Sequence, residues 1–183
     1  MKGTTKIGER INCKTEAGKL EVSISGKIPK WQESLLFFWV LAWSLCGLFI
    51  VQYLFSDWPS DQKIFLIVYL AFWTFFEYKA IHAWLWRKFG FESIVIENGE
   101  LFLKNDILDR GKSLKFFTEN IKDFGWLTSN PKSFGNVYFK SFWIVGGETI
   151  GFVHLGQKVT FGMQIEEREA AKLIGIIRKH FKK

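Results

Sequence analysis

Residues that carry out chemistry are scarce in this chain of 183 residues. It has two cysteines and three histidines, and none of them lies in a metal-binding spacing such as C-x-x-C. Glycine-rich phosphate-binding motifs and the G-x-S-x-G motif of hydrolases are also missing from the sequence. The carboxylates form no informative local pattern. These absences predict a protein that is not an enzyme and that has no catalytic residue, metal site or cofactor.

Charge is absent from the stretch between Leu35 and Phe55, which reads LLFFWVLAWSLCGLFIVQYLF. About 20 apolar residues at 1.5 Å per residue span a hydrocarbon core of roughly 30 Å. A core helix of a soluble protein would carry polar residues on one side over this length. The stretch is also too long, and starts too far into the chain, to be the apolar part of a signal peptide. We therefore predict a helix that spans a membrane.

A second apolar run, IFLIVYLAFWTFF from Ile64, is too short to span a membrane alone. Because neither Pro nor Gly occurs before Lys88, we expect the helix to continue and to place Trp84 and Trp86 at the level of the lipid headgroups. Glu77 then lies about two turns inside the membrane boundary, as a candidate intramembrane polar contact. Its carboxylate has a functional role, reaches interfacial water, or pairs with a basic group on a neighbouring helix.

Basic and acidic residues are distributed unevenly around the two runs. The segment between them, SDWPSDQK, is short and acidic, whereas the segments before the first run and after the second are basic. This asymmetry predicts that both termini lie in the cytoplasm, with the helices in a bacterial inner membrane. It also explains the formal charge of +7 without a nucleic-acid partner. Four basic residues become candidate contacts for lipid headgroups: Lys27, Lys30, Arg87 and Lys88.

Small residues on the first run offer a place for close helix contact. Ala42 and Cys46 lie four residues apart, on one helical face, and this spacing would allow another helix to approach closely. Cys13 lies in the basic N-terminal segment, so the two cysteines are too far apart to form a disulfide. A chain without disulfides fits a reducing compartment.

Short alternating runs replace the long apolar runs after Lys88. The clearest is ESIVIENGELFLKN, in which Asn98 and Gly99 join two strands as the preferred pair of a type I′ hairpin turn. One more strand, over residues 20–25, precedes the first helix. Further strands are predicted at 112–117, 121–127, 137–145, 149–155 and 158–165, with a loop over 128–136.

The C-terminal segment from Glu166 predicts an amphipathic helix, with acidic residues in its first turn and basic residues in its last. The predicted fold class is therefore α+β: a two-helix transmembrane hairpin with an antiparallel sheet or open barrel that the C-terminal helix covers. If the strand at 20–25 pairs with later strands, the hairpin is an excursion out of the β domain. The predicted parts are a basic arm (1–19), the first strand and its exit (20–30), the hairpin (31–88) and the β domain (89–183).

Two parts of the sequence resemble bacterial membrane-anchored pleckstrin-homology-like (PH-like) proteins. The first is LEVSISGKIPKW before a Trp-rich run, followed after the second run by FGFESIVIENGELFL. The second is the ending, GETIGFVHLGQKVTFGMQIEEREAAKLIGIIR. The resemblance covers most of the chain from Leu20, except residues 128–138. It implies a PH-like fold, but most such proteins have no assigned activity, so it implies no functional residues.

These features together favour a non-enzymatic accessory, scaffold or assembly subunit of an inner-membrane complex. Its expected partners are membrane lipids and other membrane-protein subunits. Two alternatives stay open. One is a ligand-gated effector, in which a β-barrel binds a nucleotide and the two spans oligomerise to breach the membrane. The other is a sensor of anionic lipid.

Overall fold

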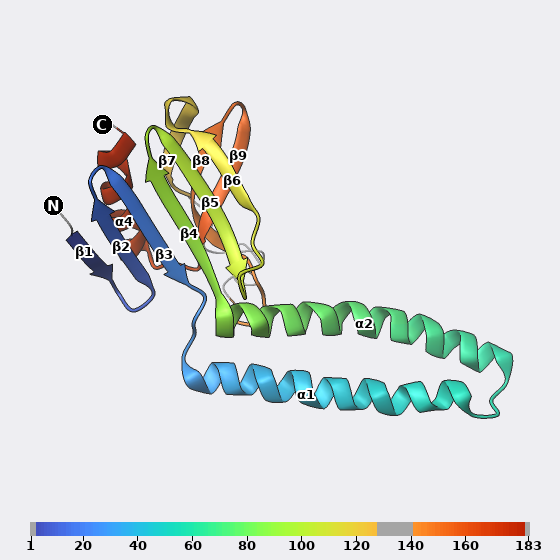
Figure 1. The fold of residues 1–183 in the computed structure, drawn as a ribbon. Helices are drawn as coiled ribbons and strands as arrows, with labels where there is room; N and C mark the ends of the chain where they lie inside the picture. The colour runs from blue at the N-terminus through green and yellow to red at the C-terminus, as the bar shows by residue number, and fades with distance from the viewer. Residues whose placement is uncertain (1–2, 128–140, 182–183) are drawn as a thin grey trace.

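The chain forms a β domain from which a pair of long helices projects. The computed structural model describes residues 3–127 and 141–181, which form an α+β fold with antiparallel sheets. The helices α1 (Lys30–Gln52) and α2 (Ser60–Phe89) lie side by side and project together from one end of the domain (Figure 1). Both are long and apolar enough to cross a membrane, which suggests membrane association.

The larger sheet has the strand order β1-β2-β3-β4-β5-β6, and every neighbouring pair is antiparallel. Its turn between β4 and β5 is the predicted hairpin, with Asn98 and Gly99 at φ values of 52° and 79°. Both central residues of a type I′ turn need a positive φ, which Asn and Gly tolerate best. The strands are β1 (Gly3–Ile7), β2 (Ile11–Glu16), β3 (Lys19–Ser25), β4 (Gly90–Glu97), β5 (Glu100–Ile107) and β6 (Ser113–Phe117).

The helical pair is inserted between two neighbouring strands of this sheet. β3 pairs with β4 along its whole length, from Leu20 opposite Ile96 to Ser25 opposite Phe91. The predicted pairing of residues 20–25 with later strands is therefore confirmed. α1 and α2 form an excursion out of one sheet, attached at both ends.

The predicted basic arm over residues 1–19 is wrong for the part that the structure describes. Residues 3–16 form β1 and β2, which extend the larger sheet beyond β3. Only Ile7, Ile11 and Cys13 of these strands are buried. Because β1 is an edge strand that is exposed on both faces, it lacks the apolar–polar alternation by which strands are recognised in a sequence.

The second sheet is smaller and has the order β7-β8-β9. The predicted strand over 137–145 lies partly outside the described residues, and its described part, 141–145, consists of turns and bends instead. The predicted loop at 128–136 lies entirely outside them. The remaining elements are η2 (Thr118–Asn120), β7 (Ile121–Trp126), β8 (Glu148–His154), β9 (Gln157–Met163) and α4 (Glu167–Phe181).

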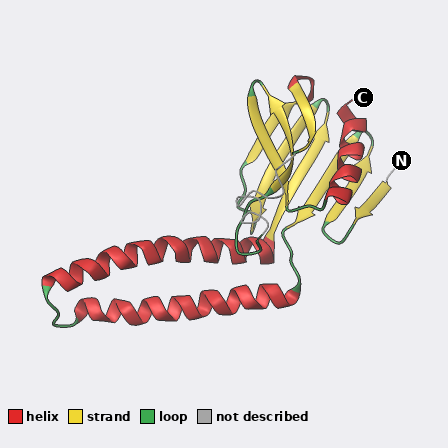
Figure 2. Cartoon of the chain, turned by 180° about the vertical axis from the view of Figure 1, so that it is seen from behind, coloured by secondary structure: helices red, strands yellow, loops and turns green. Residues whose placement is uncertain are grey.

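One hydrophobic core joins the two sheets and α4. Seen from behind, α4 lies next to the smaller sheet, over the part of the larger sheet that contains β1, β2 and β3 (Figure 2). Its buried stripe of Ala170, Leu173, Ile174 and Ile177 packs into this core. Phe152 and Phe161 enter the core from the smaller sheet. The apolar stripe predicted for the C-terminal helix is thus the side that packs into the domain.

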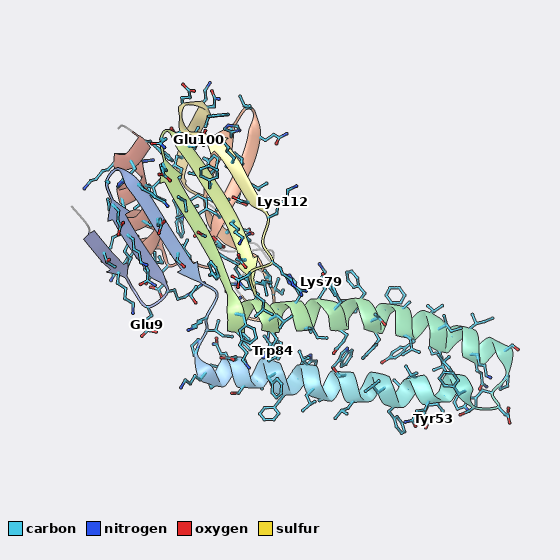
Figure 3. The ribbon with its side chains drawn as sticks, in the orientation of Figure 1. Glu9, Tyr53, Lys79, Trp84, Glu100 and Lys112 are labelled. Atoms are coloured by element: carbon cyan, nitrogen blue, oxygen red, sulfur yellow. The ribbon has the colours of Figure 1, made fainter. Side chains whose placement is uncertain are left out.

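Both long helices begin directly after a proline. Pro29 and Pro59 precede α1 and α2, where a residue without a backbone N–H costs nothing and its fixed φ suits the first turn. α1 continues into the short helix η1 (Tyr53–Phe55) before the chain turns back. Figure 3 shows Tyr53 at the free end of the pair and Trp84 close to the β domain. The Trp84 ring lies 5.5 Å from that of Phe37 on α1, between ring centroids.

Candidate functional site

The most unusual part of the molecule is the junction between the helices and the sheets. The last residue of α2, Phe89, is followed immediately by Gly90 of β4. Across the junction, the backbone N–H of Gly26 donates to the carbonyl oxygen of Gly90 at 2.9 Å. A side chain at Gly26 would collide with the backbone oxygens of Trp86 and Gly90. The close approach of the two chain segments therefore requires a glycine at this position.

Arg87, in the last turn of α2, is buried at the centre of this junction with only 1% of its surface exposed. Its Nη2 donates to the carbonyl oxygen of Ile144 (3.0 Å) and to Oε1 of Gln164 (2.8 Å). Its Nε donates to the carbonyl oxygen of Phe142 at 3.3 Å. The expectation that Arg87 contacts lipid headgroups is therefore wrong, because its side chain faces the β domain and fastens the helix to it.

Two more charged residues, the buried Glu92 and the half-buried Arg10, hold the corner where β9 turns towards α4. Glu92 accepts hydrogen bonds from the backbone N–H groups of Gly162 (2.6 Å) and Met163 (3.0 Å). Arg10 donates to the carbonyl oxygens of Met163 (3.1 Å) and Gln164 (3.0 Å), and also to that of Ser25 (2.7 Å). We call Arg10, Arg87 and Glu92 the corner clamp, since all three bind residues 162–164.

The clamp surrounds a backbone conformation that most residues rarely adopt. Gly162 and Gln164 have φ values of 76° and 52°, which places both in the left-handed region. A non-glycine residue such as Gln164 pays an energetic penalty there and persists only where its surroundings fix it. The three clamp residues come from the β1–β2 turn, the end of α2 and β4. The corner thus ties the N-terminal hairpin, the long helices and the smaller sheet together.

Burial shifts the pKa values of Arg10 and Glu92 more than the charges around them do. Burial lowers the pKa of Arg10, while Glu92 and Glu169 act in the opposite direction. Burial likewise raises the pKa of Glu92, and the two backbone N–H groups and Arg10 oppose that effect without cancelling it.

Glu92 should therefore make stability depend on pH. Its pKa in the folded chain lies above the ordinary value of 4.5. Between these two pKa values, Glu92 is protonated in the folded chain and ionised in the unfolded chain. The stabilisation is complete below the unfolded pKa and disappears as pH rises through the folded pKa. We expect the unfolding free energy of the wild-type chain, relative to Glu92→Gln, to decrease as the pH rises above the ordinary pKa of 4.5 and through the higher folded pKa. Chemical unfolding of both chains across this range measures it, and a difference that grows with pH would contradict it.

A second polar contact lies between the two helices. Glu77 has 6% of its surface exposed and accepts a hydrogen bond from the Ser44 hydroxyl of α1. One turn away, the Trp73 indole Nε1 donates to the carbonyl oxygen of Trp43 at 3.2 Å. The carboxylate of Glu77 is therefore used in helix–helix contact, through a hydroxyl and not through the basic group that was one of its expected partners.

The close approach of the helices occurs at Gly47, not at the predicted residues. Ala42 and Cys46 are both exposed, whereas Gly47 is buried against the Trp73 ring. A Cβ atom at Gly47 would overlap that ring. Adjacent helical positions point about 100° apart, so a shift of one residue changes the face completely.

Replacing Gly47 by valine should push α1 and α2 apart. We expect a loss of about 1–3 kcal/mol in the free energy of unfolding, because the new side chain cannot fit against Trp73. The matched control is Cys46→Val, which adds a β-branched side chain at the adjacent exposed position. Denaturation of the full chain in detergent measures both variants, and equal stability of the two would refute the predicted contact.

Aromatic residues after the smaller sheet's first strand also reach the helices. Trp143 lies 5.6 Å from Trp39 of α1, and Phe142 lies 6.4 Å from Trp31, between ring centroids. The segment that supplies carbonyl oxygens to Arg87 of α2 therefore also packs against α1. This segment therefore contacts both helices.

The other predicted headgroup contacts stay on the surface. Lys27, Lys30 and Lys88 are exposed near the base of the helices. The Lys88 ammonium lies 4.9 Å from the centroid of the Trp84 ring. Over residues 3–127 and 141–181, no group of three or more His, Cys, Asp and Glu side chains is arranged to hold a metal ion.

Sequence reasoning missed Arg10, Glu92 and Gln164 as site residues, although Glu92 carried a usable signal. It shares the inward face of β4 with Ile94 and Ile96, and a charge at an inward position of a strand requires partners. Arg10 and Gln164 lie in turns and gave no such signal. No protein-family model, no curated protein and no solved structure matches the chain.

Proposed function

We propose that the chain is a two-span protein of a bacterial inner membrane, in which a PH-like β domain is fixed to the cytoplasmic base of a transmembrane hairpin. Its role is that of a non-enzymatic accessory, scaffold or assembly subunit. The observation that carries this proposal is the double attachment of the hairpin to neighbouring strands, reinforced by the buried Arg87. Such a domain has little freedom to swing, which suits a subunit with a fixed position in a complex.

The surface of the helices supports membrane insertion. A core helix of a soluble protein is mostly buried, yet large apolar side chains cover the outside of both helices, among them Phe38, Phe49, Phe65 and Phe72. Water-soluble proteins rarely expose apolar patches larger than a few hundred Å². A bilayer is the solvent that such a surface requires.

Aromatic residues at the two ends of the hairpin support the same placement. Trp31 and Trp84 lie near its base, and Tyr53 and Trp58 lie together at its free end, 5.3 Å apart between ring centroids. The 22 steps from Trp31 to Tyr53 correspond to about 33 Å of helix. This matches a hydrocarbon core of roughly 30 Å with aromatic residues at both interfaces. In this placement, Lys27, Lys30 and Lys88 face the headgroups of the inner leaflet.

The arrangement of the β domain supports the PH-like assignment. Antiparallel strands in two sheets enclose the core, and a C-terminal amphipathic helix packs against them. The β1–β2 hairpin precedes the part of the chain that the resemblance covers, and it enlarges the first sheet.

Cysteine labelling tests the topology. On a Cys46→Ala background, we expect a membrane-impermeant maleimide to label Asp57→Cys, between α1 and α2, from outside intact spheroplasts. Gln157→Cys, at an exposed position at the start of β9, should react only after the membrane is opened. Labelling of Gln157→Cys in intact spheroplasts would overturn the proposed orientation.

Purification in mild detergent after crosslinking tests the scaffold role. We expect other membrane-protein subunits to accompany the chain in constant proportion. Repeated recovery of the chain as a monomer without such companions would overturn the scaffold role but not the topology.

A further inference from the structure

A groove between β1 and α4 lies outside the junction and has no role in it. It has a volume of about 470 Å³. Thr5, Lys6 and Ile7 of β1 form one side, and Lys172, Gly175 and Lys179 of α4 form the other. Thr5, Lys172 and Gly175 are exposed, and Ile7 belongs to the hydrophobic core.

One wall of this groove is an open sheet edge. Among the described residues, β1 pairs with β2 alone, so its other edge has backbone N–H and C=O groups without strand partners. Such an edge accepts an additional strand from another chain.

The charge of the groove indicates the chemistry of its partner. Three lysines line it, Lys6, Lys172 and Lys179, and its described lining residues include no aspartate or glutamate. The nearest carboxylate is that of Glu169, which lies against Gly8, so lysines still outnumber carboxylates around the groove. Complementary charge favours a partner with carboxylates and disfavours a basic one.

Gly175 gives an independent reason to expect a partner. It lies inside α4, where glycine costs about 1 kcal/mol relative to alanine. At Gly47 and Gly26, a neighbouring side chain or backbone explains the glycine, but a Cβ atom at Gly175 would meet no described atom within 4 Å. Nothing in the described chain therefore requires the small residue, whereas a segment that approaches α4 closely would.

The position of the groove favours a protein partner over a lipid headgroup. In Figures 1 and 2, β1, α4 and both chain ends lie on the side of the domain away from the free end of the hairpin. With the hairpin in the membrane, this side faces the aqueous phase. A lipid headgroup in the same membrane cannot reach it.

We propose that the groove between β1 and α4 binds an extended, acidic segment of a partner protein, which adds as a strand to the free edge of β1. This proposal rests on the proposed scaffold role, for which it names the docking surface. The carboxylates of the segment face Lys6, Lys172 and Lys179, and its backbone passes over Gly175.

Fluorescence anisotropy with the full chain in detergent tests the proposal. The probe is a labelled ten-residue peptide of alternating glutamate and valine, and its counterpart alternates lysine and valine. We expect the acidic peptide alone to bind, and Gly175→Leu to weaken it about tenfold or more. Leucine fills open space and favours the helix, so this variant should fold at least as well as wild type.

Charge-matched variants distinguish binding by the groove lysines from attraction by the overall positive charge of the chain. Lys172→Gln with Lys179→Gln should weaken binding, whereas Lys122→Gln with Lys158→Gln, on the smaller sheet, should not. Hydrogen exchange should show new protection of β1 amides when the peptide is added. If both peptides bind equally, or if Gly175→Leu leaves binding of the acidic peptide unchanged, the groove is not the proposed binding site. Companions that co-purify equally with wild type and Gly175→Leu would overturn it too while leaving the scaffold role intact.

Discussion

Replacing Arg87 by alanine should be the most damaging single change at the base of the helices. We expect a loss of about 2–4 kcal/mol in the free energy of unfolding. The change removes a buried cation, which is favourable, but it also removes the Arg87 hydrogen bonds to Phe142, Ile144 and Gln164 and opens a cavity. The neighbouring residue provides a matched control, since Lys88 is exposed and Lys88→Ala should cost less than about 0.5 kcal/mol.

A third variant separates the lost volume from the lost hydrogen bonds. Arg87→Met keeps most of the side-chain volume but has no donor, so its loss should lie between those of Lys88→Ala and Arg87→Ala. Tryptophan fluorescence during unfolding of the full chain in detergent gives all three values. If Arg87→Ala were as stable as Lys88→Ala, Arg87 would not hold the junction.

Replacing Glu92 by alanine should have a similar effect from the opposite side of the corner. The backbone N–H groups of Gly162 and Met163 would lose their acceptor in a buried position, at about 1–3 kcal/mol each. Arg10 would also lose the opposite charge near it. The total loss expected is about 2–5 kcal/mol.

The control for Glu92 lies on the same strand. Glu97, at the end of β4, is exposed, and its carboxylate lies 3.8 Å from Lys19. An exposed ion pair contributes little, so Glu97→Ala should cost less than about 1 kcal/mol. Proteolysis should also cut the chain after residue 162 more readily in Glu92→Ala, because the corner loses its support. Equal stability and equal proteolysis of Glu92→Ala and Glu97→Ala would show that Glu92 does not support the corner.

The parts of the fold that follow local rules could be predicted from the sequence. The two helices follow from long apolar runs without charge, and the β4–β5 turn follows from Asn98 and Gly99. The strand over residues 20–25 was recognised by its alternation, but its pairing with β4 stayed a condition, because the paired residues lie 66 to 76 positions apart. The helices, the turn and the single strand each rest on neighbours in the sequence, where spacing alone carries the signal.

The junction could not be predicted because its partners are distant in the sequence. Arg87 binds oxygens that lie 55, 57 and 77 residues away. A basic residue at the end of an apolar helix is usually interfacial, so the general rule led to the wrong environment for this one. The strand β1 was missed for a different reason, since an exposed edge strand has no buried face to produce alternation.

The central claim is that the helices and the β domain form one rigid body, and a distance across the junction tests it most directly. Spin labels at Asp57→Cys, at the free end of the hairpin, and Gln157→Cys, an exposed position at the start of β9, report this distance in lipid nanodiscs. Cys46 is replaced by alanine, whereas the buried Cys13 is retained, because burial raises the pKa of its thiol and keeps it unreactive. We predict one narrow distance distribution for the chain with Arg87 and a broad one for Arg87→Ala. A broad distribution with Arg87 in place would contradict the claim.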